Sequence, residues 1–328
     1  MNIYDIAKEA GVSIATVSRV LNNKGTVSAA TRARVEAILK QNNYTPSAIA
    51  RGMVSKSMRT VAVLTVDIRV PHYARTAYTI EREFSRRGYE VILCNTGGDR
   101  AETLRYLQVV NQKQVDGIVL VGSVFDTICQ GAEMEKLLTG VPVVLANGKL
   151  DLPNAYSVTV DDKYGVSLAV EHLVARGRKN IYYIKDRDTD SAKAKRDGFL
   201  EAMRRHGLAF ADHVLEAGET LEDAVNATQR LLTQGIVPDG IVCGEDLTAA
   251  GALKALLRAG LRVPGQVAVV GFNNSDYAHL CEPVLTSVDN KPEQVALLCV
   301  QLLESRIERS ELYSSVVLQP ELAQGETS

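Results

Sequence analysis

Hydrophobic and polar positions follow one pattern before about residue 60 and a different pattern after it. Before that point, apolar residues recur at intervals of three and four, which is the period of an amphipathic helix. From Val61 onward, short unbroken apolar runs alternate with stretches of helical period. The pattern therefore predicts a small helical N-terminal part followed by a much larger α/β part.

Three short helices are predicted in the N-terminal part. The first spans Ile3–Ala10 and ends at Gly11, which can adopt the positive φ of a sharp inter-helix turn at low cost. The third spans Ser28–Gln41, with Ser28 as its expected N-cap. Three helices joined by such a turn are typical of a compact helix-turn-helix DNA-binding headpiece.

The middle helix has the profile of a helix that reads the major groove. Ser13 is a good N-cap, and one helical face gathers the apolar residues Val17, Val20 and Leu21. The opposite face carries small residues, an apolar group that can meet a thymine methyl, and an arginine that can reach guanine: Ile14, Ala15, Thr16 and Arg19. An ordinary amphipathic surface helix is the alternative, and the flanking helices favour the DNA-reading interpretation.

Two segments resemble the lactose/galactose repressor (LacI/GalR) family without a gap from about residue 2 to residue 53: YDIAKEAGVSIATVSRVLNN and VSAATRARVEAILKQNNYTPSAIARGM. The resemblance implies a headpiece (1–46), a hinge helix with linker (47–59) and an effector-binding and dimerisation core (60–328). It implies a homodimer on a pseudo-palindromic double-stranded DNA operator. The DNA contacts it implies are Ser13, Ile14, Ala15, Thr16, Ser18, Arg19, Asn22, Ser28, Thr31, Arg32, Tyr44, Ala50 and Met53.

Within these contacts, the resemblance and the chemistry of the side chains suggest a division of roles. We expect Ile14, Ala15 and Arg19 to read bases, and the polar set Thr16, Ser18, Thr31 and Arg32 to contact phosphates.

The segment 47–54 is too short to form a stable helix alone in water, so a plain tether is one interpretation. The resemblance implies instead a hinge helix that folds on DNA, pairs with its copy in the second subunit, and inserts an apolar side chain into the minor groove. Met53 stands where the family usually has leucine, and the neighbouring Gly52 lowers helix propensity.

Charge is divided unevenly along the chain. The whole sequence has a net charge of −2, but residues 1–60 hold nine Lys and Arg against three acidic residues, a net of +6, which leaves −8 for the remainder. A basic N-terminal part is suited to contact with DNA phosphates, whereas an acidic remainder would be repelled by them.

The five cysteines show neither a C-x-x-C pair nor metal-ligand spacing, so structural thiols in a reducing cytosol are expected, with no metal and no cofactor. No signal peptide and no apolar run of membrane-spanning length is recognised, and we expect a cytoplasmic protein without a membrane partner.

The larger part predicts an α/β core of two doubly wound parallel-sheet lobes, similar to periplasmic binding proteins, although the alternation also allows a single large sheet. Two candidate crossovers favour two lobes: Val160–Asp162 and Ser287–Asn290. They place lobe 1 at about 60–160 and 290–320, and lobe 2 at about 162–287. Expected helices are 75–87, 101–113, 164–176, 194–206, 221–234, 247–259 and 293–308.

Ligands of open α/β sheets bind beyond the carboxyl ends of the strands, so residues after each strand are candidates for an effector site. Together with the resemblance, this rule gives His72, Tyr73, Ser123, Asn147, Asp161, Thr189, Ser191, Lys195, Thr220, Asp246 and Asn273. Two of these have structural alternatives: local packing of Tyr73 within its own loop, and a role for Asp161 as the N-cap of the next helix.

Two departures from the family bear on the effector. Lys195 stands where many members have arginine, and Asn273 stands where they have aspartate. A site that keeps a cation and loses an anion favours an acidic effector, such as a sugar phosphate or sugar acid, over a neutral sugar. A nucleoside- or purine-responsive regulator is the alternative within the family.

The sequence as a whole predicts a sequence-specific DNA-binding transcriptional regulator, of the repressor type, controlled by a small molecule bound between the lobes. Induction and corepression both stay open. A sugar-binding transport protein is disfavoured by the headpiece. A Rossmann-type enzyme is disfavoured because no G-x-G-x-x-G, phosphate loop, nucleophile elbow or metal cluster is found. The sequence shows no heptad tail, so a dimer is expected rather than a tetramer.

Overall fold

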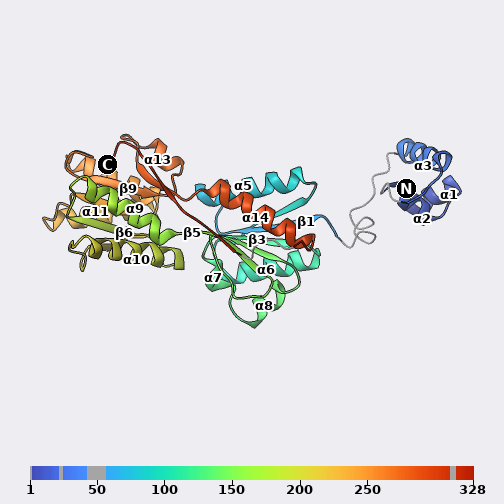
Figure 1. Cartoon of the computed structure of the whole chain (residues 1–328), viewed down its shortest axis with the longest axis horizontal. Helices are drawn as coiled ribbons and strands as arrows, with labels where there is room; N and C mark the ends of the chain where they lie inside the picture. The colour runs from blue at the N-terminus through green and yellow to red at the C-terminus, as the bar shows by residue number, and fades with distance from the viewer. Residues whose placement is uncertain (1, 22–24, 43–56, 311–314) are drawn as a thin grey trace. The chain divides into compact units, whose positions relative to one another are not determined.

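The computed structural model describes residues 2–21, 25–42, 57–310 and 315–328, and the chain divides into two compact units, 1–59 and 60–328. The predicted DNA contacts Asn22, Tyr44, Ala50 and Met53, together with the predicted hinge helix, lie outside the described residues. Figure 1 labels the helices and strands of each unit.

The first unit contains the three helices that the sequence predicts: α1 (Ile3–Ala10), α2 (Ile14–Leu21) and α3 (Ala29–Gln41). Asn2 and Asp5 cap the start of α1 reciprocally, and Gly11 ends it with φ 63°. The apolar stripes of the three helices meet in one small core, made of Ile6, Ala7, Ala10, Val17, Val20, Val35 and Ile38. Since α2 buries its predicted face here, its other face is left exposed.

Lobe 1 of the second unit is built on a six-stranded sheet of order β11-β5-β4-β3-β1-β2, in which every pair of neighbours is parallel. Its strands are β1 (Thr60–Thr65), β2 (Glu90–Asn95), β3 (Gly117–Val121), β4 (Val143–Ala146), β5 (Ala155–Val160) and β11 (Ser315–Leu318). Every residue of β1, β3 and β4 is buried, as expected for parallel strands that helices cover on both faces.

The helices of lobe 1 are α5 (Pro71–Arg86), α6 (Arg100–Gln112), α7 (Phe125–Ile128), α8 (Ala132–Leu138) and α14 (Pro292–Ile307). Figure 1 shows α5 and α14 side by side on one face of the sheet, with α6, α7 and α8 on the other. This arrangement gives the doubly wound lobe that strand–helix alternation predicts.

Lobe 2 has a second six-stranded sheet, of order β12-β10-β9-β8-β6-β7. Its strands are β6 (Ile181–Lys185), β7 (Val214–Glu216), β8 (Gly240–Cys243), β9 (Ala268–Phe272), β10 (Thr286–Asp289) and β12 (Glu321–Ala323). Only β12 runs antiparallel, against β10. The helices of lobe 2 are α9 (Asp162–Ala175), α10 (Asp190–Arg205), α11 (Leu221–Thr233), α12 (Asp246–Arg258) and α13 (Asp276–Leu280).

The chain crosses between the lobes three times, whereas the sequence suggested two crossings. Ser287 and Val288 lie inside β10, so the second crossing comes later than expected, at Asn290 and Lys291. After β11 the chain returns to lobe 2 and adds β12. The third crossing was missed because β12 has three residues and too little pattern to identify it.

Helix boundaries also differ from those expected. The helices α5 and α10 begin four residues earlier than predicted, at Pro71 and Asp190. Proline is tolerated in the first helical turn, and Thr189 caps α10 through the backbone N–H of Ala192. The short helices α7, α8 and α13 were not predicted, since a helix of one or two turns leaves little periodic signal.

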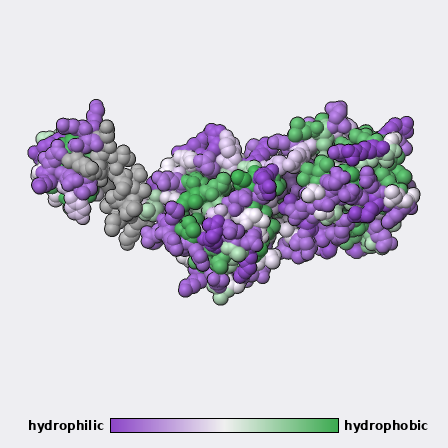
Figure 2. All heavy atoms as spheres, turned by 180° about the vertical axis from the view of Figure 1, so that it is seen from behind, coloured by the Kyte–Doolittle hydropathy of each residue, from purple (hydrophilic) through white to green (hydrophobic). Residues whose placement is uncertain are grey.

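Hydrophilic residues cover most of the face shown in Figure 2, with hydrophobic patches among them on both lobes. Tyr78 on α5, Leu93 on β2 and Leu280 on α13 are among the exposed large hydrophobic residues. None of the described helices combines the length and the apolar character needed to cross a membrane.

Close packing of α9 against α10 yields a stability prediction. A Cβ on Gly198 would collide with the backbone carbonyl of Lys163. We therefore expect Gly198→Ala to lower the free energy of unfolding by about 1–3 kcal/mol, the usual effect of overpacking a tight contact. Urea unfolding of the whole chain, followed by circular dichroism, measures this.

Gly140→Ala is the matched control, because the nearest atom to a Cβ there, Asn111 Oδ1, is 3.9 Å away. If both substitutions lower stability equally, the helix contact does not explain the effect.

Candidate functional site

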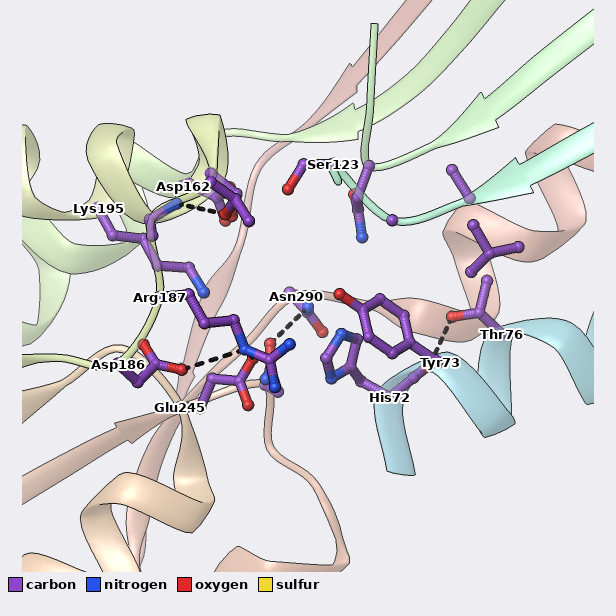
Figure 3. A pocket seen from close by; sticks show the side chains of 18 residues that line it. His72, Tyr73, Thr76, Ser123, Asp162, Asp186, Arg187, Lys195, Glu245 and Asn290 are labelled. Carbon is purple, nitrogen blue, oxygen red and sulfur yellow. Dashed lines mark hydrogen bonds and ion pairs between the residues drawn. The ribbon is translucent and has the colours of Figure 1, made fainter. Parts of the chain in front are cut away.

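The candidate site is a cavity between the lobes of the second unit, at the carboxyl ends of their strands (Figure 3). In lobe 1, β1 lies between β2 and β3, and in lobe 2, β6 lies between β7 and β8, so the strand order reverses at these positions. Such switch points are where open α/β sheets bind ligands. The cavity has an empty volume of about 570 Å³, a figure that includes space open to solvent.

Most of the residues that the sequence proposed line this one cavity. Lobe 1 contributes two residues from α5 and two from the loops after β3 and β4, and lobe 2 contributes residues from α10 and the loop after β9. These residues are His72, Tyr73, Ser123, Asn147, Thr189, Ser191, Lys195 and Asn273. His72 and Asn273, which are 201 positions apart in sequence, therefore line one cavity, because strand ends gather at one edge of each sheet.

Two proposed residues are helix caps that do not line this cavity, although Asp161 lines a neighbouring one. Asp161 accepts a hydrogen bond from the backbone N–H of Tyr164 at 2.9 Å and caps α9, which was the alternative interpretation. Thr220 caps α11 and donates from Oγ1 to Asp223 at the exposed start of that helix. The neighbour of Asp161, Asp162, lines the cavity instead.

Asp246 is a further correction, because it lies behind the cavity wall and is only 1% exposed. Its carboxylate accepts hydrogen bonds from the backbone N–H of Ser275 (2.7 Å), from Ser275 Oγ (2.8 Å) and from Ser287 Oγ (2.6 Å). These bonds join α12, β10 and the loop after β9. Asp246 therefore positions the wall, while the preceding residue, Glu245, faces the cavity.

Lys195 lines the cavity, but the protein itself occupies its charge. The side chain is buried, and Nζ donates to the carbonyl oxygen of Gly244 at 2.9 Å. Nζ also lies 3.9 Å from the centre of the Phe272 ring, where the negative face of the aromatic ring attracts a cation. Lys195 thus makes a weaker case for an acidic effector than the sequence suggested.

Arg187 is the main residue that sequence analysis missed. Its guanidinium lies 3.3 to 3.4 Å from the carboxylates of Asp186, Glu219 and Glu245, and Figure 3 shows it pointing into the cavity toward Tyr73. Burial alone lowers the pKa of Arg187, but the nearby carboxylates, Glu245 first among them, outweigh burial and raise it. Its position two residues after the end of β6 was the available signal.

The carboxylates of the cavity outnumber its cations. Asp162, Asp186 and Glu245 face Arg187 and Lys195 among the described lining residues. Burial raises the pKa of Asp162 and of Asp186, and the charge of Glu245 raises that of Asp186 further. Gly244 makes this crowding possible, because a Cβ there would lie 2.5 Å from Asp186 Oδ1.

Two amide oxygens in the cavity wall have no hydrogen-bond partner among the described residues: Oδ1 of Asn147 and Oδ1 of Asn290. Both atoms are buried, and Asn290 Nδ2 is already engaged with Asn273 Oδ1 at 2.8 Å. Leaving a buried acceptor unsatisfied costs about 1–3 kcal/mol. The two amides therefore favour a ligand that donates hydrogen bonds.

An aromatic pair closes the side of the cavity that lobe 1 provides. The rings of His72 and Tyr73 lie with centroids 3.9 Å apart, and Gly122 allows the Tyr73 ring close to the loop after β3. Burial lowers the pKa of His72 to about 3, with help from the charges of Lys195 and Arg187. His72 is therefore neutral at physiological pH and adds no charge to the site.

The helical head presents the candidate DNA-reading face on α2. Ser13, Ile14, Ala15 and Arg19 are exposed, Thr16 and Ser18 are half-buried, and Ile14 is 39% exposed. Exposure of an isoleucine on a helix of eight residues is the feature that a groove contact would explain.

The remaining described DNA candidates lie at the start of α3. Ser28 Oγ accepts from the backbone N–H of Thr31 at 3.2 Å and caps the helix. Arg32 follows Thr31, and its Nη1 lies 3.9 Å from Oε1 of Glu36. The capping serines Ser13 and Ser28 thus fix the first turns of α2 and α3, which carry most of the candidate contacts.

Comparison with known proteins gives matches for both units. Residues 2–47 match the model of bacterial regulatory proteins of the lacI family, and residues 170–328 match a periplasmic binding protein-like domain. An HTH-type transcriptional regulator of Lachnoclostridium phytofermentans is 35% identical over 306 residues, which is 92% of each chain. A ribose operon repressor of Halalkalibacterium halodurans is 34% identical over 311 residues, covering 94% of this chain and 91% of the repressor.

Among solved structures, the lac repressor dimer bound to operator and the anti-inducer ONPF matches with a TM-score of 0.88 and 25% identity. The match covers 100% of this chain and 98% of the repressor chain.

The buried carboxyl of Asp246 predicts a pH dependence of stability. Burial raises its pKa to about 6, although Ser287 and Ser275 donate to the ionised form. A carboxyl whose pKa is raised on folding stabilises the fold at low pH, and this contribution is lost as pH rises through the folded pKa. Between pH 5 and 7, we expect the wild-type protein to lose about 1 kcal/mol of unfolding free energy relative to Asp246→Asn.

Urea unfolding of both proteins at several pH values measures the difference. A constant difference between pH 5 and 7 contradicts the raised pKa. Asp197→Asn, which changes an exposed aspartate on α10, is the matched control.

Proposed function

We propose that this chain, which belongs to the lacI family of bacterial regulatory proteins, takes a neutral sugar as its effector. The protein is a DNA-binding transcriptional repressor that a small molecule controls. Its partners are an operator in double-stranded DNA, the effector, and a second copy of the chain. Since its operator lies in the bacterial cytoplasm, we place the protein there as well.

The charge of the cavity is the observation that carries the proposal. Three carboxylates line it, and both cations are engaged, Arg187 by carboxylates and Lys195 by a carbonyl oxygen. A phosphate or carboxylate ligand would add negative charge to a site that already has an excess of it. The geometry therefore favours a neutral effector over the acidic one that the sequence alone suggested.

Hydroxyl groups suit the remaining lining. Carboxylates and the free amide oxygens of Asn147 and Asn290 accept hydrogen bonds from hydroxyls, and Arg187 donates to them. The ring of Tyr73 offers an apolar surface on which the C–H face of a sugar ring can lie. A nucleoside is the second candidate, but the aromatic lining comes from one side of the cavity only, among the described residues.

Control of DNA binding follows from the contacts of both lobes with one ligand. Tyr73, Ser123 and Asn147 belong to lobe 1, while Arg187 and Glu245 belong to lobe 2, so a bound effector links the two lobes. It stabilises whichever lobe arrangement brings both sets of side chains to the ligand, in proportion to its differential affinity for that state. The effector acts as inducer or corepressor according to whether this arrangement disfavours or favours operator binding.

For the head, we propose that α2 lies in the major groove. Exposed Ile14, Ala15 and Arg19 read bases, while Ser13, Thr16 and Ser18 meet the backbone. At the start of α3, Ser28, Thr31 and Arg32 add phosphate contacts. Asn22, Tyr44, Ala50 and Met53, with Met53 as the minor-groove wedge, complete the proposed contacts outside the described residues.

The effector proposal predicts which ligands bind. Titration calorimetry with neutral sugars, sugar phosphates, sugar acids and nucleosides should show measurable binding in the neutral sugar group. Arg187→Ala and Glu245→Gln should each weaken that binding about 10-fold or more, since each removes a charged hydrogen-bond partner. Arg196→Ala, an arginine on α10 that does not line the cavity, should leave the affinity within about 2-fold.

Tight binding of a sugar phosphate, a sugar acid or a nucleoside, with no neutral sugar bound, contradicts the proposal. Unchanged affinity in both cavity variants would place the effector elsewhere.

The DNA-reading proposal predicts separate effects on affinity and on sequence discrimination. Arg19→Ala should lower operator affinity roughly 10-fold and reduce the ratio of operator to random-sequence binding, because a base contact is lost. Arg32→Ala should weaken binding to the operator and binding to random sequence about equally. It should also reduce the slope of log affinity against log salt by about 1. Fluorescence anisotropy with labelled duplexes measures both quantities.

Arg34→Ala removes the same charge from an exposed position outside the proposed contacts and should preserve the discrimination ratio. If Arg19→Ala preserves it too, Arg19 does not read bases.

A further inference from the structure

The cavity between the lobes does not end at the residues that surround the proposed effector. A second cavity, with an empty volume of about 690 Å³, shares Ser123, Asn147, Asp162 and Ser191 with the first. Figure 3 shows Ser123 and Asp162 at the end of the first cavity opposite to His72 and Glu245. The two cavities therefore adjoin each other at this end, between the same two lobes.

The second cavity, called the outer cavity below, is lined by polar groups from both lobes. Lobe 1 contributes Asp126 and Lys149, and lobe 2 contributes Lys163 and Asp190. Carboxylates and ammonium groups that project from opposite walls can accept and donate hydrogen bonds to a string of hydroxyls. A ligand that extends here would keep contacts with both lobes, as it does in the first cavity.

Asn147 joins the two cavities. Its side chain lines both, and its buried Oδ1 has no hydrogen-bond partner among the described residues. The backbone at this position has φ 58°, a left-handed conformation that asparagine tolerates better than most residues. A buried acceptor at the junction is best satisfied by a ligand group that passes from one cavity to the other.

Asp126 is the best-placed acceptor in the outer cavity. Its Oδ1 accepts a hydrogen bond from the backbone N–H of Lys149 at 2.7 Å, and no hydrogen bond to Oδ2 is found within the described chain. Gly148 leaves room for this carboxylate, because a Cβ there would lie 2.5 Å from Asp126 Oδ1. Burial raises the pKa of Asp126 to about 7. The protein itself therefore offers few groups that stabilise the ionised form of this carboxyl.

We propose that the effector is an oligosaccharide of at least two units, with one unit in the first cavity and the next in the outer cavity. This inference rests on the proposed function, because it extends the same sugar site. Asn147 meets the linkage region, and Asp126 and Asp190 bind the hydroxyls of the second unit from opposite walls.

The other end of the first cavity offers a less suitable extension. A third cavity shares only His72 and Asn273 with the first, and the rest of its lining is Pro71, Ala74, Arg75, Tyr78, Ser275, Asp276 and Pro292. It has fewer hydrogen-bonding side chains than the outer cavity. We therefore assign the second sugar unit to the outer cavity.

Titration calorimetry on the full-length dimer tests the inference. The probes are glucose, galactose, xylose and ribose, and the disaccharides cellobiose, maltose, lactose and xylobiose. The tightest disaccharide should bind at least about 10-fold more tightly than its tightest component monosaccharide, as expected when one or two further charged hydrogen bonds form.

Two variants, one from each wall, locate the second unit. Asp126→Ala and Asp190→Ala should each lower affinity for that disaccharide about 5- to 10-fold and leave monosaccharide affinity within about 2-fold. Asp197→Asn is the control for loss of an acidic charge, and Arg75→Ala probes the third cavity. Asp190 is exposed, so its variant keeps the test valid if Asp126→Ala fails to fold.

The outcomes separate this inference from the proposed function. Equal affinity for a monosaccharide and its disaccharides, or outer-cavity variants that leave disaccharide affinity unchanged, overturns the inference and leaves the sugar effector intact. A selective loss in Arg75→Ala alone overturns it as well, since the second unit would then lie in the third cavity. Binding of acidic ligands or nucleosides with none of the sugars overturns both proposals.

Discussion

The site depends on the rule that a buried charge must be paired. Arg187 lies at the switch point of lobe 2, surrounded by Asp186, Glu219 and Glu245 at 3.3 to 3.4 Å. Arg187, Asp186 and Glu245 are largely removed from water, and burying any one of them without its partners would cost several kcal/mol. The cluster therefore holds its members in place before any ligand arrives, and a ligand finds donors and acceptors already positioned.

Parallel sheets explain why such a cluster can form at this place. The carboxyl ends of β6 and β8 are neighbours, so Asp186 and Glu245 meet although they are 59 positions apart. The Asp246 network with Ser275 and Ser287 then fixes the wall behind Glu245. Stability and recognition are linked here, because the same loops that bury these charges form the surface that faces the effector.

Much of this architecture could be predicted from the sequence. The head was predictable because three caps and one buried stripe on α2 act locally, within a few residues of each other. The strand ends were predictable as candidate positions for the same local reason. Arg187 and Glu245 were missed because their role depends on which strands become neighbours, and the alternation of strands and helices does not fix that order.

Asp161 and Thr220 show the converse limit. A polar residue at a strand or loop end can satisfy a helix N-terminus as well as a ligand, and in both cases the hydrogen bond to the helix takes the side chain. The third crossing between the lobes was likewise hidden, since β12 is recognised by its partner β10 rather than by its own three residues. Pairing between distant segments is the information that a local pattern lacks.

That third crossing has a consequence for how the protein is made and how it moves. Neither lobe is a continuous piece of chain, so neither sheet is complete until β11 and β12 have been synthesised, and the two lobes should fold as one cooperative body rather than in sequence. Three separate backbone segments then connect the two lobes. Sliding or separation is prevented, and what remains is a bending rotation about these segments, which is the motion that a ligand held from both sides can control.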